Sequence, residues 1–187
     1  MRVPLHRLQS VVVFGAVLLT PPLIQACASA GITVVLLDRA GRFQARVEGP
    51  VSGNVLLRRA QYARADEAHD IVRAFVCGKI ANQRAVLQRA LRDHGGDMAP
   101  SARDATEDAV ERLARSLRRA ALAPIETDEL RGLEGDAARL YFAVFGGLIR
   151  AADPEIRFEG RSRRPPLDPV NALLSFLYTL LVHDCRS

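Results

Sequence analysis

The spacing of apolar residues changes from a period of two to a period of about 3.6 near residue 50. Before that point, residues 11–15 and 32–37 are short apolar runs, and residues 42–48 alternate between apolar and polar side chains. These patterns predict three β-strands. Pro21 and Gly31 lie between the first two strands and mark the start and the end of a helix of about ten residues.

The three predicted strands differ in how far they should be buried. The β-branched, apolar run at 32–37 predicts a strand buried on both faces. The run at 42–48 should turn Phe43, Ala45 and Val47 inward and leave the polar residues between them outside. Three short strands and one helix make a poor independent sheet, so we expect further strands upstream of this sequence.

From Ser52 onward the apolar period is helical, which marks a domain boundary near residues 49–53. It predicts helices at about 54–65, 66–93, 101–121, 127–150 and 169–183. Asp168 is a good N-cap for the last of these, with Pro169 at the first helical position. The expected fold class is therefore α+β. A partial amino-terminal β-domain (strand, helix, strand, strand) should occupy residues 1–50, and a mainly α-helical domain should occupy residues 51–187.

The last predicted helix is apolar on nearly all sides, which is typical of a helix at the centre of a bundle. A thin polar line runs through it at Asn171, Ser175 and Tyr178. Buried amides and hydroxyls need hydrogen-bond partners. We expect those partners in Glu134 and in the arginine-rich, proline-broken segment at 153–168, here called the connector.

Glu134 is the most unusual residue of the helical half. It lies in a predicted helix, yet Gly132 and Gly135 flank it, and each glycine costs about 1 kcal/mol against alanine in a helix interior. Paired glycines let another backbone, or a nucleic acid strand, come close to the carboxylate. Because Glu134 shares a face with Tyr141 and Phe145 at the edge of the apolar stripe, it should be partly buried and should need a cation, either an arginine or a metal ion.

The charge balance favours a polyanionic partner. The net charge is +5 and the pI is about 9.7. Lys79 is the only lysine, and such an arginine bias fits a GC-rich genome as well as phosphate binding. The candidate contacts to a DNA backbone are Arg58, Arg59, Arg161, Arg163 and Arg164. Arg131 and Arg139 lie close to Glu134 in the sequence, so an ordinary ion pair is the alternative to a metal site there.

Cysteine usage and hydropathy indicate the compartment. Cys27, Cys77 and Cys185 are scattered among apolar neighbours, which predicts small buried side chains in a reducing environment. No apolar run reaches the ~18 residues that cross a bilayer, so we expect a cytoplasmic protein without a membrane partner. The amino terminus imitates a secretory signal, but prolines interrupt its apolar run, which makes export a minor alternative.

Four stretches of the chain carry a resemblance to a known family. They are Gly53-Asn-Val-Leu-Leu-Arg-Arg, Lys79-Ile-Ala-Asn-Gln-Arg, Arg131-Gly-Leu-Glu-Gly-Asp-Ala-Ala-Arg-Leu-Tyr-Phe and Gly160-Arg-Ser-Arg-Arg-Pro-Pro-Leu-Asp-Pro-Val-Asn-Ala-Leu-Leu-Ser-Phe-Leu-Tyr. In this order they closely resemble the CRISPR-associated endonuclease that integrates new spacers, in its subtype I-C branch. The resemblance covers nearly the whole chain from Val11 and is far more specific than a lone Gly-x-Glu-Gly.

The resemblance implies a metal-dependent DNA endonuclease and integrase, which inserts spacers into a CRISPR array by strand cutting or transesterification. It implies that the β-domain pairs two protomers into a homodimer and that the helical domain carries the active site. Glu134 would be the catalytic metal ligand, for Mg²⁺ or Mn²⁺. The metal would activate a DNA 3′-hydroxyl or water and offset charge at the phosphate. Asn171 and Tyr178 would line or brace this site.

The implied partners are DNA, as spacer precursor and CRISPR repeat, and the small dimeric CRISPR-associated protein of the adaptation complex. In the family the other metal ligands are a histidine and acidic residues downstream of the helix with Asn171 and Tyr178, and His183 does not match that histidine. We therefore expect an interior fragment that lacks both ends and is inactive by itself. The alternative is a non-catalytic, arginine-rich helical DNA-binding or scaffold module, because one carboxylate alone cannot make a competent metal site.

Overall fold

The computed structural model describes residues 3–50, 53–122, 124–151, 153, 155–163 and 165–185. The chain divides into two compact units. The sheet unit comprises Met1–Val55 and Ala172–Ser187, and the bundle unit comprises Leu56–Asn171. The α+β fold class is confirmed, because a small sheet near the amino terminus precedes a mostly helical region. The assignment of a dimerisation role to residues 1–50 and a catalytic role to residues 51–187 stays a prediction.

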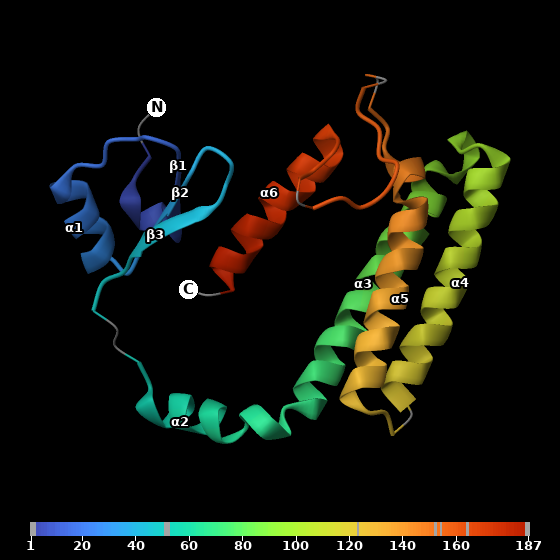
Figure 1. Cartoon of the computed structure of the whole chain (residues 1–187), viewed down its shortest axis with the longest axis horizontal. Coiled ribbons are helices and arrows are strands. Elements are labelled where there is room, and N and C mark those ends of the chain that lie inside the picture. Colours follow the sequence, from blue (N-terminus) through green and yellow to red (C-terminus); the bar gives the residue numbers. More distant parts are fainter. Residues whose placement is uncertain are drawn as a thin grey trace. The chain divides into compact units, whose positions relative to one another are not determined.

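The sheet unit is built on a three-stranded sheet in the order β1 (Ser10–Phe14), β2 (Thr33–Leu37) and β3 (Phe43–Val47) (Figure 1). β1 and β2 are parallel and are joined by α1 (Pro21–Ser29), while β3 is antiparallel to β2. The central strand is buried as predicted, since Val34, Val35 and Leu37 are at most 2% exposed.

The predicted facing of the third strand is wrong. Phe43 is 51% exposed and Ala45 is also exposed, and only Val47 packs against the core of the sheet unit. The pairing explains the difference. Leu36 pairs with Ala45 but Leu37 pairs with Phe43, so β3 carries one extra residue at this point. Such a bulge interrupts the alternation of inward and outward side chains on an edge strand.

The bundle unit has three long helices, α3 (His69–His94), α4 (Pro100–Leu122) and α5 (Thr127–Phe145), which follow the shorter α2 (Val55–Ala63). The three long helices pack against one another (Figure 1). Ile80, Leu87, Leu113 and Leu130 are completely buried in their shared core. This core matches the apolar spacing of the sequence, and it places α5 directly beside α3.

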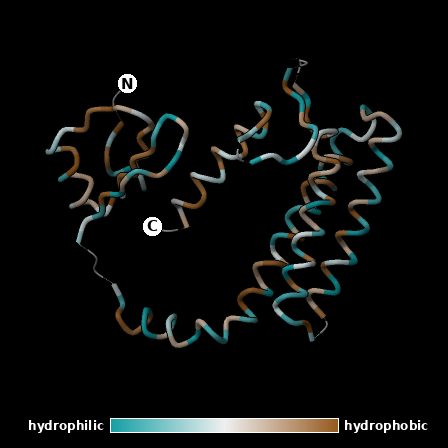
Figure 2. Tube along the Cα trace, in the orientation of Figure 1, coloured by the Kyte–Doolittle hydropathy of each residue, from teal (hydrophilic) through white to brown (hydrophobic). Residues whose placement is uncertain are grey.

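α4 is an amphipathic helix with a solvated outer face, as its sequence predicts. Leu113 is buried in the bundle core. The outer face carries the i,i+4 ion pairs Arg112–Asp108 and Arg115–Glu111. Figure 2 shows the resulting turn-by-turn change between hydrophobic and hydrophilic positions along this helix.

α5 ends at Phe145, earlier than the predicted 150, and a 3₁₀ turn at Gly146–Leu148 follows it. The backbone of the connector comes very close at this point. A Cβ atom added to Gly146 would lie 2.6 Å from the carbonyl oxygen of Phe158. Only glycine permits this approach, so the connector packs directly against the end of α5.

The last helix, α6 (Pro169–Asp184), begins where its sequence signals predict. The prediction that it forms the centre of a bundle is wrong for the described residues, because the bundle consists of α3, α4 and α5 and the apolar side chains of α6 are widely exposed. These are Leu173, Phe176, Leu177, Tyr178, Leu181 and Val182. From Ala172 onward the helix belongs to the sheet unit, where the Phe176 ring lies 5.2 Å from that of Phe14. No helix in the described ranges combines the length and hydropathy needed to cross a membrane.

Asn171 ties the connector to the first turn of α6. Its side chain is completely buried. Its carbonyl oxygen accepts hydrogen bonds from Arg161 Nη1 (2.7 Å) and from the Ser162 backbone N–H (3.0 Å). Its amide nitrogen donates to the Gly160 carbonyl (2.7 Å) and to Asp168 Oδ2 (2.6 Å). The predicted partnership with the connector is confirmed.

Asp168 caps this helix as predicted. The backbone N–H of Asn171 donates to Asp168 Oδ1 over 2.7 Å. This hydrogen bond is the main reason that the pKa of Asp168 lies below its usual range, and the Asn171 side-chain amide adds to the effect. A depressed pKa in the folded state means that the stabilisation is fully present at neutral pH and is lost as the pH falls through the lowered pKa.

Replacement of the Asn171 side chain should destabilise the bundle unit. Asn171→Ala leaves the Arg161 and Ser162 donors and the Asp168 acceptor without their shared partner, which should cost about 1–3 kcal/mol of unfolding free energy. Urea unfolding followed by circular dichroism would measure it. Asn82→Ala, at an exposed position of α3, is the matched control and should stay within about 0.5 kcal/mol. Equal losses in the two variants would show that the buried network contributes no specific stability.

Candidate active site

Glu134 lies on α5 and forms an ion pair with Lys79 of α3. The Glu134 side chain is 33% exposed and the Lys79 side chain 44%. The predicted partial burial of Glu134 is therefore confirmed. The two arginines proposed as its ordinary partners are engaged elsewhere, since Arg131 pairs with Asp128 and Arg139 with Asp136. Each of these pairs joins residues three apart on one helix, which holds the arginines away from the carboxylate.

Small residues leave room around the Glu134 carboxylate. One helical turn further on, its neighbours are Ala137, which is buried, and Ala138, which is half-buried. Cβ atoms added to Gly132 or Gly135 would meet no atom within 4 Å. No contact within the described chain therefore requires glycine at either position. This open space is what a second backbone or a nucleic acid strand would occupy, as the sequence predicts.

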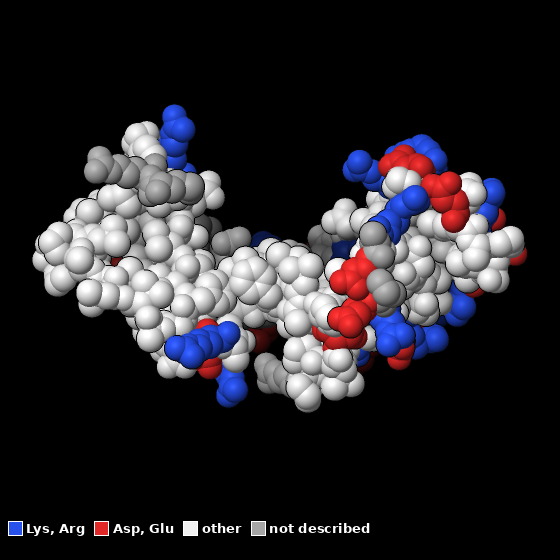
Figure 3. Space-filling model, turned by 90° about the horizontal axis from the view of Figure 1, so that it is seen from above, with Lys and Arg blue, Asp and Glu red and all other residues white. Residues whose placement is uncertain are grey.

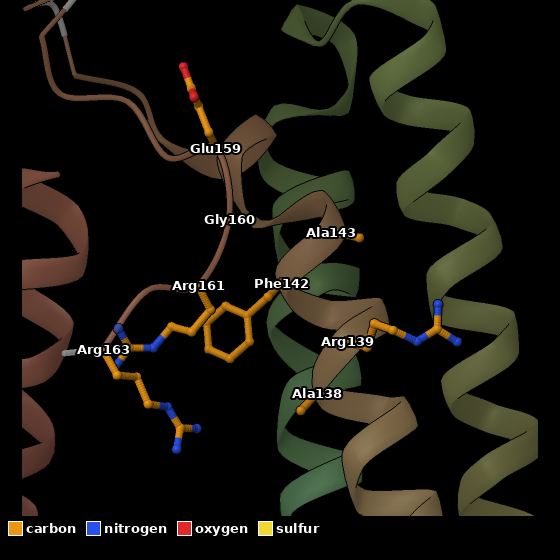
Figure 4. Close-up of a pocket in the computed structure, with 8 residues that line it drawn as sticks. All are labelled: Ala138, Arg139, Phe142, Ala143, Glu159, Gly160, Arg161 and Arg163. Carbon is orange, nitrogen blue, oxygen red and sulfur yellow. The ribbon is translucent and has the colours of Figure 1, made fainter. Parts of the chain in front are cut away.

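A cleft of about 500 Å³ opens between α5 and the connector, within the bundle unit. Its residues are Ala138, Arg139, Phe142, Ala143, Glu159, Gly160, Arg161 and Arg163 (Figure 4). Glu134, Ala138 and Phe142 follow one another at intervals of four along α5, so the wall of the cleft continues toward the Glu134 carboxylate. The cleft and the carboxylate thus belong to one side of the helix.

The cationic groups of the cleft differ in direction. In Figure 4 the Arg139 guanidinium points away from the Phe142 ring, whereas Arg161 and Arg163 lie on the connector side of that ring. Arg161 is held by Asn171. Arg163 is exposed and forms no ion pair with any described residue. The cleft therefore combines an aromatic face with two arginines from one segment, a combination suited to nucleic acid.

A cluster of aromatic rings anchors the connector on α5. Phe158 of the connector is buried, with its ring centroid 5.1 Å from that of Phe145 and 6.0 Å from that of Phe142. Rings at these separations attract one another as they bury apolar surface. Arg161 and Arg163 thus belong to a segment that is held in place by contacts at Phe158 and at Asn171.

The remaining predicted DNA contacts have separate positions. Arg58 and Arg59 are exposed on α2 and form no ion pair within the described part of the chain. Arg164 lies outside the described residues. In Figure 3 basic and acidic side chains intermingle over the helical bundle, so the face that it shows carries no purely basic patch there. The DNA contacts predicted at Arg58, Arg59, Arg161 and Arg163 stay predictions.

The two predicted supporting residues have different outcomes. Asn171 braces the connector and through it the cleft, and its hydrogen-bond partners are residues of the connector, including Asp168, and not Glu134. Tyr178 lies in the sheet unit, where it is 42% exposed, and its role at the site stays a prediction. Ser175 Oγ, the third member of the polar line, is buried without a hydrogen-bond partner among the described residues.

The donor set around Glu134 does not fit a complete divalent-cation site. No group of three or more His, Cys, Asp or Glu residues lies together in the described part of the chain. The side chain of His183 lies outside the described residues. Cys27 is buried and Cys77 half-buried, but Cys185 is exposed just after α6, so the expectation of three buried cysteines is wrong for that residue. Within the described residues, this site offers a cation one carboxylate that already has a lysine partner.

The sequence prediction missed Lys79 and Phe142 as members of the site. Two signals in the sequence could have indicated Lys79. It is the only lysine of the chain, and it begins one of the four stretches that carry the family resemblance. Its partnership with Glu134 could not be predicted, because the two residues are 55 positions apart and meet only through the packing of α3 on α5. Phe142 has the spacing of an ordinary core residue.

Comparison with known proteins identifies the family. The family model described as CRISPR associated protein Cas1 matches residues 1–187. The chain is 62% identical over 186 residues to a CRISPR-associated endonuclease Cas1 of Rhodospirillum rubrum, and 50% identical over 193 residues to one of Chlorobaculum tepidum. In both cases the match covers 100% of this chain and 54% of the relative. The chain thus spans about half the length of the curated relatives that it matches.

Solved structures agree with these matches. One chain of a Cas6-RT-Cas1–Cas2 complex has a TM-score of 0.69 at 29% identity, over 92% of this chain and 18% of that chain. A Cas1 protein from Thermotoga maritima has a TM-score of 0.67 at 22% identity, over 96% of this chain and 53% of that protein, and this likeness concerns the fold. The match of the family over the whole sequence carries the conclusion that this chain belongs to the CRISPR associated protein Cas1 family.

Proposed function

We propose that this sequence belongs to a DNA endonuclease and integrase that inserts new spacers into a CRISPR array, with Glu134 as one of its active-site ligands. The observation that carries the proposal is the position of Glu134. It lies on one side of α5, at the end of a row that lines a cleft with an aromatic ring and two arginines. The named activity of the curated relatives, an endonuclease, supports the same reading.

In this proposal the Glu134 carboxylate is an oxygen ligand for Mg²⁺ or Mn²⁺, because hard divalent cations prefer carboxylate oxygens. No group of three or more His, Cys, Asp or Glu side chains lies together among the described residues, so the proposal requires further ligands. The chain's own contribution is to place one carboxylate beside a DNA-binding cleft. Alanines at positions 137 and 138 keep the space next to it open.

The DNA would run along the connector. Arg163 offers an exposed guanidinium, and Arg161 is held in place by Asn171, so a phosphate bound there would meet a preorganised partner. The Phe142 ring offers a flat apolar surface for a base. Arg58 and Arg59 on α2 would add backbone contacts, and the substrates would be the spacer precursor and the CRISPR repeat.

The proposal includes a homodimer formed through the sheet unit and a complex with the small dimeric CRISPR-associated protein of adaptation. The likeness to a chain of a Cas6-RT-Cas1–Cas2 complex supports a partner of the Cas2 kind. Because the proposed substrate is a CRISPR array, the proposal includes a cytoplasmic location.

Removal of the Glu134 carboxylate should abolish the chemistry without unfolding the protein. In a protein of the relatives' full length, Glu134→Ala should reduce DNA cleavage and integration to background in Mg²⁺ or Mn²⁺, as measured with labelled substrates on gels. Glu129→Ala removes another ion-paired glutamate from α5 and is the matched control. It should keep its activity. Retained activity of Glu134→Ala would show that Glu134 is not a ligand.

Arg163 should contribute to DNA affinity through phosphate binding. Arg163→Gln should weaken binding similarly for all DNA sequences and lower the slope of log affinity against log salt by about 1. Fluorescence anisotropy at several salt concentrations would measure both effects. Arg112→Gln, which removes an arginine already paired with Asp108 on α4, is the control and should leave the slope unchanged. Equal slopes in the two variants would contradict a contact at Arg163.

The second candidate function is a non-catalytic, arginine-rich DNA-binding or scaffold module. It is favoured by the lack of any three-residue donor cluster in the described ranges. A nuclease assay on the 187-residue chain tests this point. We expect DNA binding without cutting in Mg²⁺ or Mn²⁺, because one carboxylate does not complete a metal site. Robust cutting that depends on Glu134 would refute the incomplete site and exclude the scaffold function.

A further inference from the structure

Lys79 forms the ion pair with Glu134 in the described part of the chain. It projects from α3, and its ammonium group pairs with Glu134 Oε1 on the adjacent helix. Every other cation of the chain is an arginine. Arg131 and Arg139, the arginines that flank Glu134 in the sequence, have aspartate partners of their own on α5. In the described chain the charge of Glu134 is therefore balanced from α3 and not from its own helix.

The packing of the bundle determines this pairing. Ile80, next to Lys79, is completely buried, and so is Leu130, one turn before Glu134. Both belong to one core, so neither helix can rotate without exposing apolar surface. The Lys79 ammonium is thereby held within reach of the carboxylate.

The surroundings of Lys79 contain an unused oxygen. Gln83 lies one turn further along the same side of α3. Its Oε1 atom is buried and has no hydrogen-bond partner among the described residues. A buried carbonyl oxygen without a donor is costly, so Gln83 adds an unused acceptor one turn from Lys79 on this side of α3.

We propose that Lys79 is the resident cation of Glu134 and competes with a divalent cation for its carboxylate. A single carboxylate that is paired with a lysine is a poor metal ligand. This pairing is one reason that the donor set does not fit a metal site. A metal ion reaches the Glu134 carboxylate only as the ammonium group withdraws. Lys79 is then a positioning residue, which holds Glu134 toward α3 until metal and DNA arrive. The competition rests on the proposed ligand role of Glu134, whereas the ion pair does not.

Metal binding without turnover tests the competition. Electron paramagnetic resonance of free Mn²⁺ reports binding to the 187-residue chain directly. Lys79→Met keeps the length of the side chain and removes its charge. It should raise the Mn²⁺ affinity by about two- to fivefold, the range expected for loss of a partly exposed ion pair. The increase should vanish in Glu134→Gln. Arg119→Met makes the same change of charge at another ion pair between two helices, that with Glu129 of α5, and should leave the affinity near that of the wild type.

A thermal double-mutant cycle tests the ion pair by itself. Lys79→Met, Glu134→Gln and the double variant, unfolded without metal, should show a coupling of about 1–4 °C in Tm. A coupling of zero overturns the pairing. With coupling present, equal Mn²⁺ affinities in the wild type and Lys79→Met overturn the competition but leave the ligand role of Glu134 standing. If no Mn²⁺ binding depends on Glu134 in any variant, the competition fails together with the proposed ligand role, and the cycle still reports the pair.

Discussion

The packing of α5 against α3 is the contact on which the rest of the bundle unit depends. Completely buried residues from both helices share one core, and this core sets the rotation of each helix about its axis. Lys79 of α3 and Glu134 of α5 lie at the edge of that core, where a side chain can touch its neighbour helix and still reach solvent. A carboxylate in such a position is accessible to ligands, and its negative charge is balanced by the lysine.

The connector adds the second half of the site by a different kind of contact. It has neither helix nor strand to position it, so side chains do so instead. Phe158 packs between the rings of α5, and Asn171 binds three successive residues of the connector through its amide. Buried amides are stable only when their partners are complete. The connector therefore presents Arg161 and Arg163 beside Phe142 in a defined way, although its sequence is rich in proline and arginine.

The chain spans about half the length of its curated relatives, and its described residues gather no group of three or more metal-binding side chains. The described residues contribute a single carboxylate, a resident lysine and a cleft with arginines. A lysine can balance the charge of a carboxylate and hold it in place, but it cannot bind an oxygen nucleophile as a Lewis acid does. In the proposed function, Lys79 balances the charge of Glu134 until further ligands and a metal ion complete the site.

Local sequence signals determined most of the secondary structure. The change of period near residue 50, the proline and aspartate at the start of α6 and the ion pairs of α4 all act over a few residues, so they could be predicted without the fold. The family and the candidate role of Glu134 also followed from the order of four short stretches.

Only the tertiary structure decided which residues meet. The bulge in β3 turned Phe43 outward, and the backbone of Phe158 came to lie directly against Gly146 at the end of α5. Glu134 pairs with Lys79, 55 residues away, and not with the nearby arginines. Those arginines pair with aspartates one turn away on their own helix. The apolar period shows on which side of its own helix or strand a residue lies. A contact between residues of two packed helices depends on the rotation of both helices, which no local pattern contains.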